Sequence, residues 1–480
     1  MKNDIIKFLG LEDSNVKIVS FTSNKYQRIL TLEKTLETHY CDICNHIMHS
    51  KGVYQRKVNH PVMQDGRQVI LMINQRRWVC TNPLCRNTVN DQFNFVEPGR
   101  RNTNITDMMI LDAFRDYTLT ASKIASLFGV SDTYAITLFS RYVDMPKRAL
   151  TEAICIDEVH INVDSSCKYA LVIQDFITGE PIDLLPSRRE DVTEPYFASI
   201  PIKQRLNVKY VVTDMYRPYI GFVDKYFPNA VSIVDSFHVV KYINSHLYNY
   251  INKLIRKYRD RDELRHDQLE QEFKRKIEFI PSVEYYLLKK YKWLILKNNE
   301  DINYSAKPFY NFKLRRYVTL GDIERMIFNF EPELKKLRDL KETYIRFNKT
   351  HGGNHKEACI KLRYIIDDYR ASEYDMFHTI ADSLEYHYDS IINSFILIQR
   401  KLKDGDHVSR LSNGPMEALN HIVKDIKRNG RGYRNFSHLR NRFLFSQRKN
   451  SAILGVPKTM DEISVNTGKK RGPYRKKEKK

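Results

Sequence analysis

The alternation of hydrophobic and polar positions divides the chain into five regions. Residues 1 to about 100 carry short alternating stretches that predict half-buried strands, and residues 102–147 follow the period of amphipathic helices. Short apolar runs bounded by turn residues fill 154–239 and predict buried strands. A long charged segment at about 240–405 has a helical period again, and 412–450 predicts a helix followed by basic residues. This order indicates a multidomain α/β protein.

Composition favours a folded protein with a polyanionic partner. At 480 residues the chain is too long for one hydrophobic core, and its 42 % hydrophobic content argues against global disorder. No apolar run is long enough to cross a bilayer and the N-terminus lacks the apolar core of a signal peptide, so we expect a cytoplasmic protein with no membrane partner. Lys and Arg number 79 against 58 Asp and Glu, a net charge of +21 that favours nucleic acid as the partner.

Four of the seven cysteines form two close pairs near the N-terminus. Cys41 and Cys44 are followed by Cys80 and Cys85, and two pairs of thiolates on tight turns suit tetrahedral zinc. We therefore predict a structural Zn²⁺ site that stabilises a segment with little core of its own. Four unrelated core cysteines are the alternative. Three nearby histidines could replace a cysteine as a zinc ligand, although we rank them below the cysteines. They are His39, His46 and His49.

Residues 119–131 have the pattern of a helix-turn-helix. Gly129 permits the turn, and Ser131 is placed to cap the second helix. The helix before this motif has Asn104 or Thr106 as candidate caps. An ordinary helical hairpin would share much of this pattern, but the basic charge favours DNA binding. The face expected to enter a major groove carries Thr133, Tyr134 and Thr137.

Three apolar runs of the β-rich region end in an acidic residue. These acids are Asp157, Asp214 and Asp235, and His238 follows the third. An acid at the end of a buried strand lies at the edge of the sheet, where a site can form. A single such acid could merely cap the next helix, but three in one sheet favour a functional site.

A further acid, Glu417, lies in the first turn of a predicted helix. Ser412 or Asn413 can cap this helix, and Pro415 suits its first turn. Alone, Glu417 would be an ordinary glutamate at a helix N-terminus. Seven residues later, Lys424 lies on the same face and could contact a DNA phosphate. We expect the same of the basic residues that follow, which are Lys427, Arg428, Arg431 and Arg434.

Carboxylates in this arrangement suit metal-dependent phosphoryl transfer. Two Mg²⁺ ions about 4 Å apart can activate an attacking hydroxyl and stabilise the leaving oxygen. Mg²⁺, or Mn²⁺ in its place, prefers hard oxygen ligands, so Asp157 and Asp214 on neighbouring strands form the expected pair. Asp235 remains the alternative to Asp214 as the second ligand.

These motifs, in this order, resemble bacterial insertion-sequence transposases of the ISL-three type. The resemblance covers nearly the whole chain, including the cysteine pairs and the helix-turn-helix. The matching stretches are 156–158, 183–188, 213–216, 234–238, 411–414 with Glu417 and Asn420, and 432–436.

The resemblance implies an RNase H-like core with a DDE triad. Carried over onto this sequence, the triad is Asp157, Asp214 and Glu417, with Mg²⁺ as the cofactor. Asp235 and His238 match an Asp-x-x-His motif, which implies a supporting role in orienting a ligand or contacting a DNA end.

The fold class expected from these patterns and the resemblance is a multidomain α/β protein with an RNase H-like mixed-sheet core. The core is interrupted by a large all-helical insertion, and zinc-binding and helix-turn-helix domains precede it. The expected domains are a zinc-binding domain at 1–100, a helix-turn-helix domain at 101–148, a catalytic core at 149–240 and 408–450, the insertion at 241–407, and a basic, disordered tail at 451–480.

The sequence therefore predicts a DDE transposase that binds the terminal inverted repeats of an insertion sequence, cleaves DNA and transfers the freed strand. We expect a homodimer or larger assembly on double-stranded DNA, associated with the bacterial nucleoid. Two alternatives stay open: an RNase H-like nuclease without strand transfer, and a non-catalytic zinc and helix-turn-helix regulator. The presence of all three candidate acids weighs against the regulator.

Overall fold

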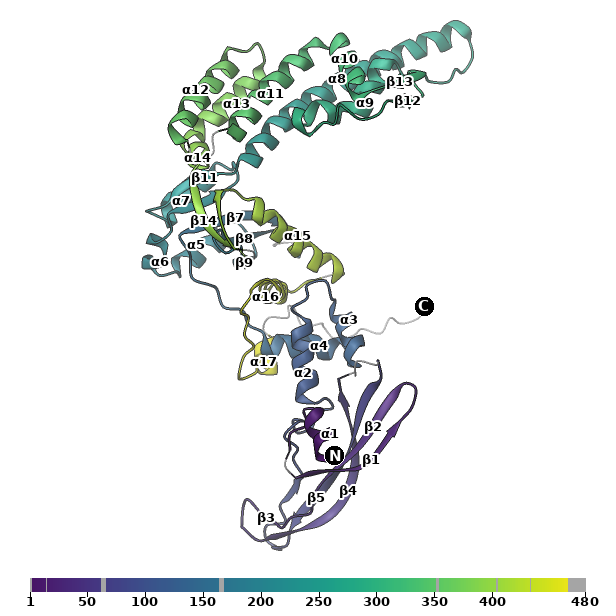
Figure 1. The fold of residues 1–480 in the computed structure, drawn as a ribbon, viewed down its shortest axis with the longest axis vertical. Coiled ribbons are helices and arrows are strands. Elements are labelled where there is room, and N and C mark those ends of the chain that lie inside the picture. Colours follow the sequence, from purple (N-terminus) through teal and green to yellow (C-terminus); the bar gives the residue numbers. More distant parts are fainter. Residues whose placement is uncertain are drawn as a thin grey trace, which may run out of the picture. The chain divides into compact units, whose positions relative to one another are not determined.

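The structure, a computed structural model, divides the chain into two compact units. One comprises Met1–Lys147, His160–Tyr169 and His421–Lys480, and the other Arg148–Val159 and Ala170–Asn420. Figure 1 labels the helices and strands of both units. The residues described are 2–13, 15–61, 66–163, 168–350, 354–402, 405–431 and 433–464.

A six-stranded sheet forms the N-terminal part of the first unit, and it runs in the order β1-β2-β5-β4-β3 with β6 paired to β5. Side chains of the long strand β5 alternate between buried and less buried positions, as the sequence pattern predicts. The inward side chains of this sheet, among them Leu32, Val58 and Leu71, form a hydrophobic core. The elements are α1 (Lys2–Phe8), β1 (Val16–Ser23), β2 (Gln27–Lys34), β3 (His39–Tyr40), β4 (Ile47–His60), β5 (Gln68–Cys80) and β6 (Thr88–Asn90).

Three helices follow the sheet: α2 (Asn104–Ala113), α3 (Ala121–Phe128) and α4 (Asp132–Tyr142). The hydroxyl of Ser131 accepts from the amide of Tyr134 and caps α4, as predicted. Gly129 has φ 65° and ends α3 in the left-handed conformation, which glycine adopts without strain. The cap of α2 is Thr103, one residue before the first of the two candidates, because Asn104 and Thr106 already lie inside the helix.

Helix α16 (Phe436–Gln447) packs against α4 in the first unit. The ring of Phe139 in α4 contacts the rings of His438 and Phe445 at 5.1 and 5.8 Å. The side chain of Asn441 accepts from the amide of Met145 and donates to the carbonyl of Val143. The sequence pattern grouped α16 with the β-rich region, yet its apolar face meets the helix-turn-helix.

The residues after α16 also contact α4. Leu454 donates its amide to the carbonyl of Tyr142 at 2.8 Å, and Lys458 forms an ion pair with Asp144 at 2.6 Å. A short helix, α17 (Met460–Ser464), follows. Residues 451–464, expected within a tail, are therefore packed, while the basic stretch from Lys469 lies outside the described residues.

A five-stranded sheet in the order β11-β10-β7-β8-β9 forms the centre of the second unit. Strand β10 runs parallel to both β7 and β11, whereas β8 and β9 are antiparallel, so the sheet is mixed. The apolar runs of the sequence match these strands, and most of their side chains are buried. The strands are β7 (Ala153–His160), β8 (Tyr169–Asp175), β9 (Pro181–Leu185), β10 (Tyr210–Thr213) and β11 (Val231–Val234).

Helices α5 (Glu190–Ala198), α6 (Ile202–Leu206) and α7 (Pro218–Tyr226) flank this sheet. Aromatic side chains join α5 to α7, because Phe197 contacts Phe222 and Phe227 at ring distances of 5.0 and 5.5 Å. These rings belong to one buried cluster with the inward side chains of β7 and β8.

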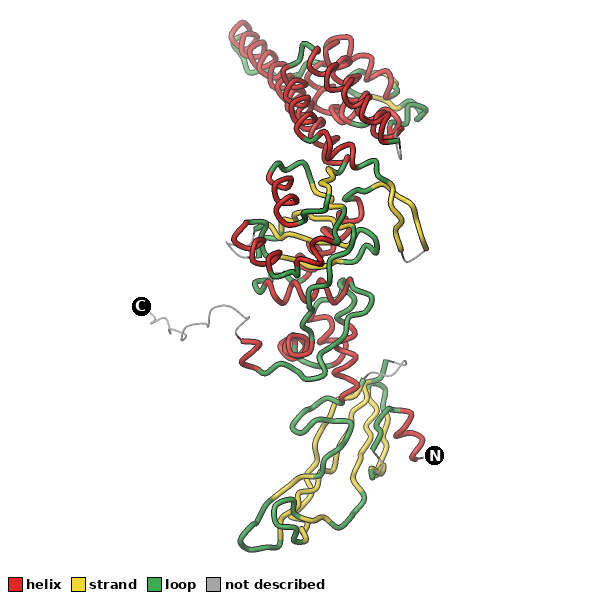
Figure 2. Tube along the Cα trace, turned by 90° about the vertical axis from the view of Figure 1, so that its left-hand side faces the viewer, coloured by secondary structure: helices red, strands yellow, loops and turns green. Residues whose placement is uncertain are grey.

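A large helical segment follows β11 and contains the biggest hydrophobic cluster of the described residues. Figure 2 shows this bundle of helices in red and the strands in yellow. Its helices are α8 (Ser236–Phe273), α9 (Val283–Leu296), η1 (Asn299–Asp301), α10 (Leu320–Phe330), α11 (Pro332–Thr350), α12 (His355–Ala371), α13 (Asp375–Tyr386) and α14 (Tyr388–Asn393).

The segment is not entirely helical, so the expectation of an all-helical insertion needs correction. Strands β12 (Phe309–Asn311) and β13 (Arg316–Val318) form one antiparallel pair, and β14 (Leu397–Leu402) and β15 (Gly405–Arg410) form another. Arg315, with φ 53°, and Gly405, with φ 130°, take the turn conformations that let these chains reverse. Helix α15 (Gly414–Asn429) follows β15. None of the described helices combines the length and apolar character that a membrane crossing requires.

Candidate functional site

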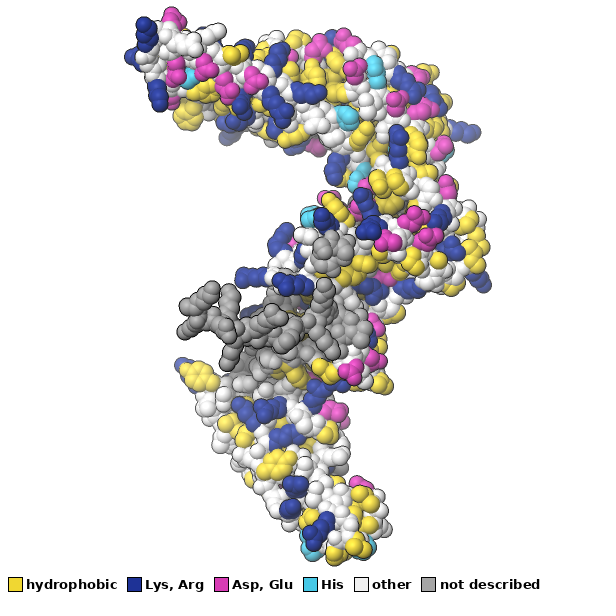
Figure 3. Space-filling view, turned by 180° about the vertical axis from the view of Figure 1, so that it is seen from behind, with side chains coloured by type: hydrophobic (Ala, Val, Ile, Leu, Met, Phe, Trp, Pro, Cys, Tyr) yellow, Lys and Arg dark blue, Asp and Glu magenta, His cyan; other side chains and the backbone are white. Residues whose placement is uncertain are grey.

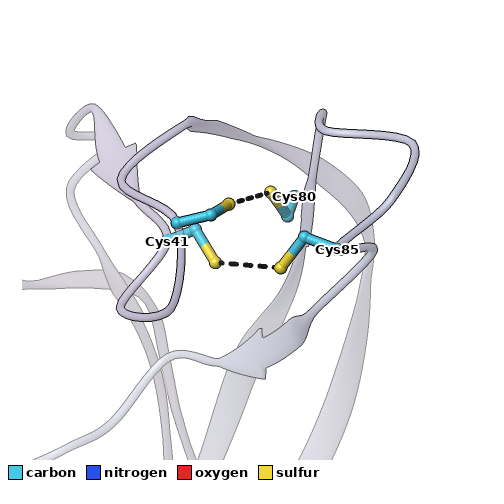
Figure 4. A group of neighbouring side chains, drawn as sticks. Cys41, Cys80 and Cys85 are labelled. Carbon is cyan, nitrogen blue, oxygen red and sulfur yellow. Dashed lines mark hydrogen bonds between the residues drawn. The ribbon is translucent and has the colours of Figure 1, made fainter.

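The four clustered cysteines converge as predicted. Cys41 and Cys44 lie on the turn before β4, Cys80 ends β5, and Cys85 lies on the turn before β6. The Sγ atoms of Cys41 and Cys85 are 3.7 Å apart, and those of Cys44 and Cys80 are 3.4 Å apart (Figure 4). All four Sγ atoms lie within 4.8 Å of one another. Four soft sulfur ligands around one point fit tetrahedral zinc.

The three nearby histidines have other contacts. His39 stacks on Trp78 with ring centroids 4.5 Å apart. His46 places Nδ1 2.9 Å from the carbonyl of Cys44, and hydrogen bonding to the backbone at Cys44 raises the pKa of His46. A hydrogen bond from the backbone at His46 in turn lowers the pKa of Cys44 to about 6, which favours the thiolate that binds metal. Within the described part of the chain, these four cysteines are the group of possible metal ligands whose ligand atoms all lie within 4.8 Å of one another.

By the register of the parallel strands, Asp157, Asp214 and Asp235 lie at one level of the second sheet. In the register of the parallel strands, Val212 pairs with Cys155 and Thr213 pairs with Val234. Continuing both pairings places Asp214 beside Asp157 on one side and beside Asp235 on the other. The sequence predicted an acid at the end of each strand. This holds for Asp214 and Asp235, whereas β7 continues past Asp157 to His160. The register of the parallel strands then makes the three acids neighbours.

Asp157 is half-buried and has specific hydrogen-bond partners. Its Oδ1 accepts from the amide of Glu158 at 2.8 Å, and its Oδ2 accepts from the side-chain amide of Asn420 at 2.7 Å. Burial raises the pKa of Asp157, and the negative charge of Asp214 raises it further. The hydrogen bonds and the imidazole of His238 oppose this rise in pKa. A cation between Asp157 and Asp214 would relieve their repulsion.

Asp214 and Asp235 have different surroundings. Asp214 is half-buried, and its Oδ1 accepts from the amide of Tyr216 at 2.9 Å. Asp235 is 3 % exposed and caps α8, accepting from the amide of Phe237 at 3.4 Å. Burial raises the pKa of Asp235, while His238 and the backbone at Asn413 lower it. Asp214 is thus the more open carboxylate, and Asp235 fixes the start of a helix.

Glu417 lies exposed in the first turn of α15, as the sequence predicts. The carbonyl of Asn413 accepts from the amides of Met416 and Glu417, so the helix begins directly after Asn413. Asn420 lies three residues after Glu417 and therefore on the same face of the helix. Because Asn420 bonds to Asp157, this face of α15 meets β7 at Asp157.

A second polar cluster adjoins the acids, and the sequence pattern alone did not assign it a role. Glu158 accepts from Arg188 at 2.6 Å and from the hydroxyl of Tyr219 at 2.8 Å. The guanidinium of Arg188 lies over the ring of Tyr216, 4.7 Å from its centroid. Two of the stretches that carry the family resemblance, 183–188 and 213–216, thus meet through Arg188 and Tyr216. Because some thirty residues separate Arg188 from Tyr216, the sequence pattern did not predict this contact.

The predicted groove-facing residues of α4 do not all face outward. Thr133 is exposed and Thr137 is half-buried. The hydroxyl of Tyr134 donates to both carboxylate oxygens of Asp107 in α2, at 2.7 and 2.9 Å. Burial raises the pKa of Tyr134 to about 12. Tyr134 therefore joins α4 to α2, and its hydroxyl is not free to contact a base.

The predicted basic residues of α15 and the loop after it also differ in their surroundings. Lys424 is half-buried, and Lys427 donates to the carbonyl of Asn162 at 2.6 Å. Arg428 is paired with Asp425 at 3.1 Å. Arg431 and Arg434 are exposed. The last two are therefore the most available for an anionic ligand.

Comparison with protein-family models matches residues 154–443 to a family described as transposase, of the DDE type and the ISL-three group. The matched region contains all of the strand-end acids, the helical segment and Glu417. Comparison with curated proteins gives no match.

Proposed function

The chain belongs to the ISL-three family of DDE transposases, and we propose that it cleaves and joins DNA strands with Asp157, Asp214 and Glu417. The observation that carries this proposal is the hydrogen bond from Asn420 to Asp157. It brings the helix face that bears Glu417 to Asp157 on β7, and the register of β10 supports a position for Asp214 beside Asp157. We therefore propose that the three acids, Asp157 and Asp214 from neighbouring parallel strands and Glu417 from α15, lie near one another.

The mixed five-stranded sheet supports an RNase H-like core. The adjacent strands β7, β10 and β11 are parallel, with Asp157 within β7 and with Asp214 and Asp235 directly after β10 and β11. Helices on the same unit cover the buried strands. We assign the core to 149–240 together with 408–420, interrupted by the helical segment at 241–407. Residues 421–450, which the sequence pattern added to the core, belong to the first unit.

The carboxylates fit a divalent hard cation. Asp157 and Asp214 repel each other, and carboxylate oxygens are the ligands that Mg²⁺ and Mn²⁺ prefer. Glu417 would complete the ligand set. When bound, Mg²⁺ supplies activation of the attacking oxygen and stabilisation of the leaving oxygen.

The chain's own residues orient this site. Asn420 and the amide of Glu158 hold the two oxygens of Asp157 in place. Asp235 anchors α8, and His238, on the first turn of that helix, lies close enough to lower the pKa of both Asp157 and Asp235. His238 is therefore suited to orient a carboxylate or to contact a DNA end.

Double-stranded DNA is the proposed partner. The zinc-binding sheet at 1–100 and the helix-turn-helix at 101–148 would recognise the terminal repeats of the element. Basic side chains are spread over the N-terminal sheet with few acidic ones between them, which suits a polyanion (Figure 3). Because two element ends must be joined, we propose a homodimer or larger assembly on DNA.

Strand cleavage by purified full-length protein tests the proposal. Asp157→Asn and Glu417→Gln should each lower cleavage of a plasmid carrying the element ends by about 100-fold or more, with DNA binding retained. Asp224→Asn is the matched control, because Asp224 is an exposed acid on α7. Full cleavage by both site variants would overturn the assignment.

Strand transfer separates the remaining alternatives. Pre-cut element ends with a free 3′-hydroxyl should join to target DNA when the wild-type protein and Mg²⁺ are present. Cleavage without joining would identify a nuclease, and binding without either reaction would identify a regulator.

A further inference from the structure

A groove of about 1110 Å³ lies within the first unit and is formed by segments far apart in the sequence. Its walls come from the residues around the start of α3, one face of α4, the end of α15, the loop residues 430, 431 and 433–435, and His438 and Arg442 of α16. The helix-turn-helix thus shares a concave surface with a segment some three hundred residues later in the chain.

The groove contains a buried arginine. Arg442 is 2 % exposed, and it lines the groove from α16. Its Nη2 donates to the carbonyls of Asp116 and Leu119, at 2.7 and 2.9 Å, which fixes the chain just before α3. Its Nη1 has no hydrogen-bond partner among the described residues. Burial lowers the pKa of Arg442 to about 10, and the carboxylate of Asp116 opposes this only in part. A buried guanidinium with a spare donor is costly unless a further anion lies nearby.

The N-terminus of α3 opens into the same groove. Thr120 caps the helix by accepting from the amide of Lys123. The amides of Ala121 and Ser122, both of which line the groove, lie in the first turn, where no intrahelical acceptor exists. The first turn carries no acidic side chain, so its partial positive charge is not offset there.

The described loop residues 430, 431 and 433–435 line the same groove as this helix end. A Cβ at Gly430 would lie 2.5 Å from ring carbons of Tyr433, so only glycine lets the loop fold back this tightly. Tyr433 stacks on His438 of α16 with ring centroids 5.5 Å apart. The exposed side chains of Arg431 and Arg434 then line the groove.

We propose that this groove binds a backbone phosphate of double-stranded DNA. The amides of Ala121 and Ser122 and the side chains of Arg431 and Arg434 make the contacts, and Arg442 holds the helix end and adds its charge. A helix N-terminus with converging arginines is an anion site of this kind. The inference rests on the proposed function, since it locates one contact to the same DNA.

Such a contact fixes the register of the helix-turn-helix on DNA. Phosphate contacts position a protein without reading sequence, while the side chains of α4 contact the bases. The C-terminal segment of the chain is therefore part of the DNA-binding surface and not only a support for α15.

Binding of full-length protein to a fluorescein-labelled DNA duplex of mixed sequence, measured by anisotropy between about 50 and 200 mM KCl, tests the proposal. The double variant Arg431→Gln/Arg434→Gln should lower affinity at least tenfold and reduce the slope of log K against log salt by about two. Arg189→Gln/Lys203→Gln removes the same charge from exposed positions of the second unit and should leave the slope within about half a unit of wild type.

A second variant excludes a purely structural effect. Ser122→Glu places a carboxylate in the first turn of α3, where it stabilises the helix but repels a phosphate. The variant should therefore keep its thermal stability and lose at least about tenfold in DNA affinity. Ser122→Gln, similar in size but uncharged, should bind within about twofold of wild type.

Unchanged affinity and slope in both Arg431→Gln/Arg434→Gln and Ser122→Glu would overturn the phosphate site. Cleavage that depends on Asp157 would still stand in that case, so the two proposals fail separately. Absence of DNA binding by the wild-type protein would overturn both.

Discussion

The side-chain amide of Asn420 donates a hydrogen bond to Oδ2 of Asp157 at 2.7 Å, although 263 residues separate them in the chain. The bond joins the second turn of α15 to Asp157 within the central strand β7. It fixes the orientation of Oδ2 and brings the helix face that also bears Glu417 to this strand. A single amide thus links the two parts of the proposed catalytic core.

Removing this amide should slow the reaction without unfolding the protein. Asn420→Ala should lower the cleavage rate by about 10- to 100-fold, because residues that orient metal ligands typically contribute this much. The dependence of rate on Mg²⁺ concentration should shift to higher concentration. Asn393→Ala is the control, since Asn393 donates to the carbonyl of Ser232 at 3.2 Å, away from the acids. A wild-type rate for Asn420→Ala would show that the bond has no functional role.

Asp214 and Asp235 should respond differently to replacement. Asp235→Ala removes the cap of α8 and should lower the free energy of unfolding by about 0.5–2 kcal/mol. Asp214→Ala should leave stability within about 0.5 kcal/mol of wild type but abolish cleavage. Urea unfolding and plasmid cleavage of both variants measure the difference. Cleavage that survives in Asp214→Ala but not in a stable Asp235→Asn variant would make Asp235 the second ligand.

Zinc removal should affect the N-terminal sheet. Cys80→Ser takes one sulfur from the cluster, so the protein should retain much less zinc by elemental analysis and melt at a lower temperature. Treatment of the wild-type protein with a strong chelator should give the same shift. Cys359→Ser is the matched control, because Cys359 lies on α12 and should change neither zinc content nor melting. Equal zinc content in the two variants would refute the site.

Acid should destabilise the first unit. Burial lowers the pKa of His438 and of His60 from 6.5 to about 4. Since the folded-state pKa lies below the unfolded value, the unfolded state binds protons first as the pH falls. Stability is therefore fully present above about pH 6.5 and decreases towards about pH 4.

Urea midpoints measured across this pH range check the expectation. The positive charge of Arg442 also lowers the pKa of His438, so this residue should contribute strongly. His438→Gln should flatten the profile below about pH 6.5, whereas replacement of the exposed His407 should not. A profile that is the same with and without His438 would contradict the prediction.

Local patterns predicted much of the secondary structure. The strands that carry Asp157, Asp214 and Asp235 appear as apolar runs because both faces of the sheet are buried. The turn at Gly129 and the cap at Ser131 follow from conformational and hydrogen-bonding preferences of single residues. The cysteine cluster followed from spacing, since two close pairs on turns can converge on one metal.

Local sequence patterns did not predict the contacts between segments that are distant in the chain. Tyr134 was expected to face DNA, but its hydroxyl donates a hydrogen bond to Asp107. Helix periodicity predicts which side chains share a face of the helix, but it does not predict which other element packs against that face. The short strands β12 and β13 were hidden in a charged segment whose average period is helical. Helix α16 packs on the helix-turn-helix because its apolar side chains meet Phe139, a contact no local pattern encodes.

By itself, the sequence determined which residues could do chemistry: three strand-end acids, a helix-borne glutamate, two cysteine pairs and an excess of basic side chains. The tertiary structure decided which of them meet. Strand register aligned Asp214 with Asp157, and one hydrogen bond brought α15 to the same place. The physical reason is that side-chain type and period are local properties, whereas a site is made by packing that joins residues hundreds of positions apart.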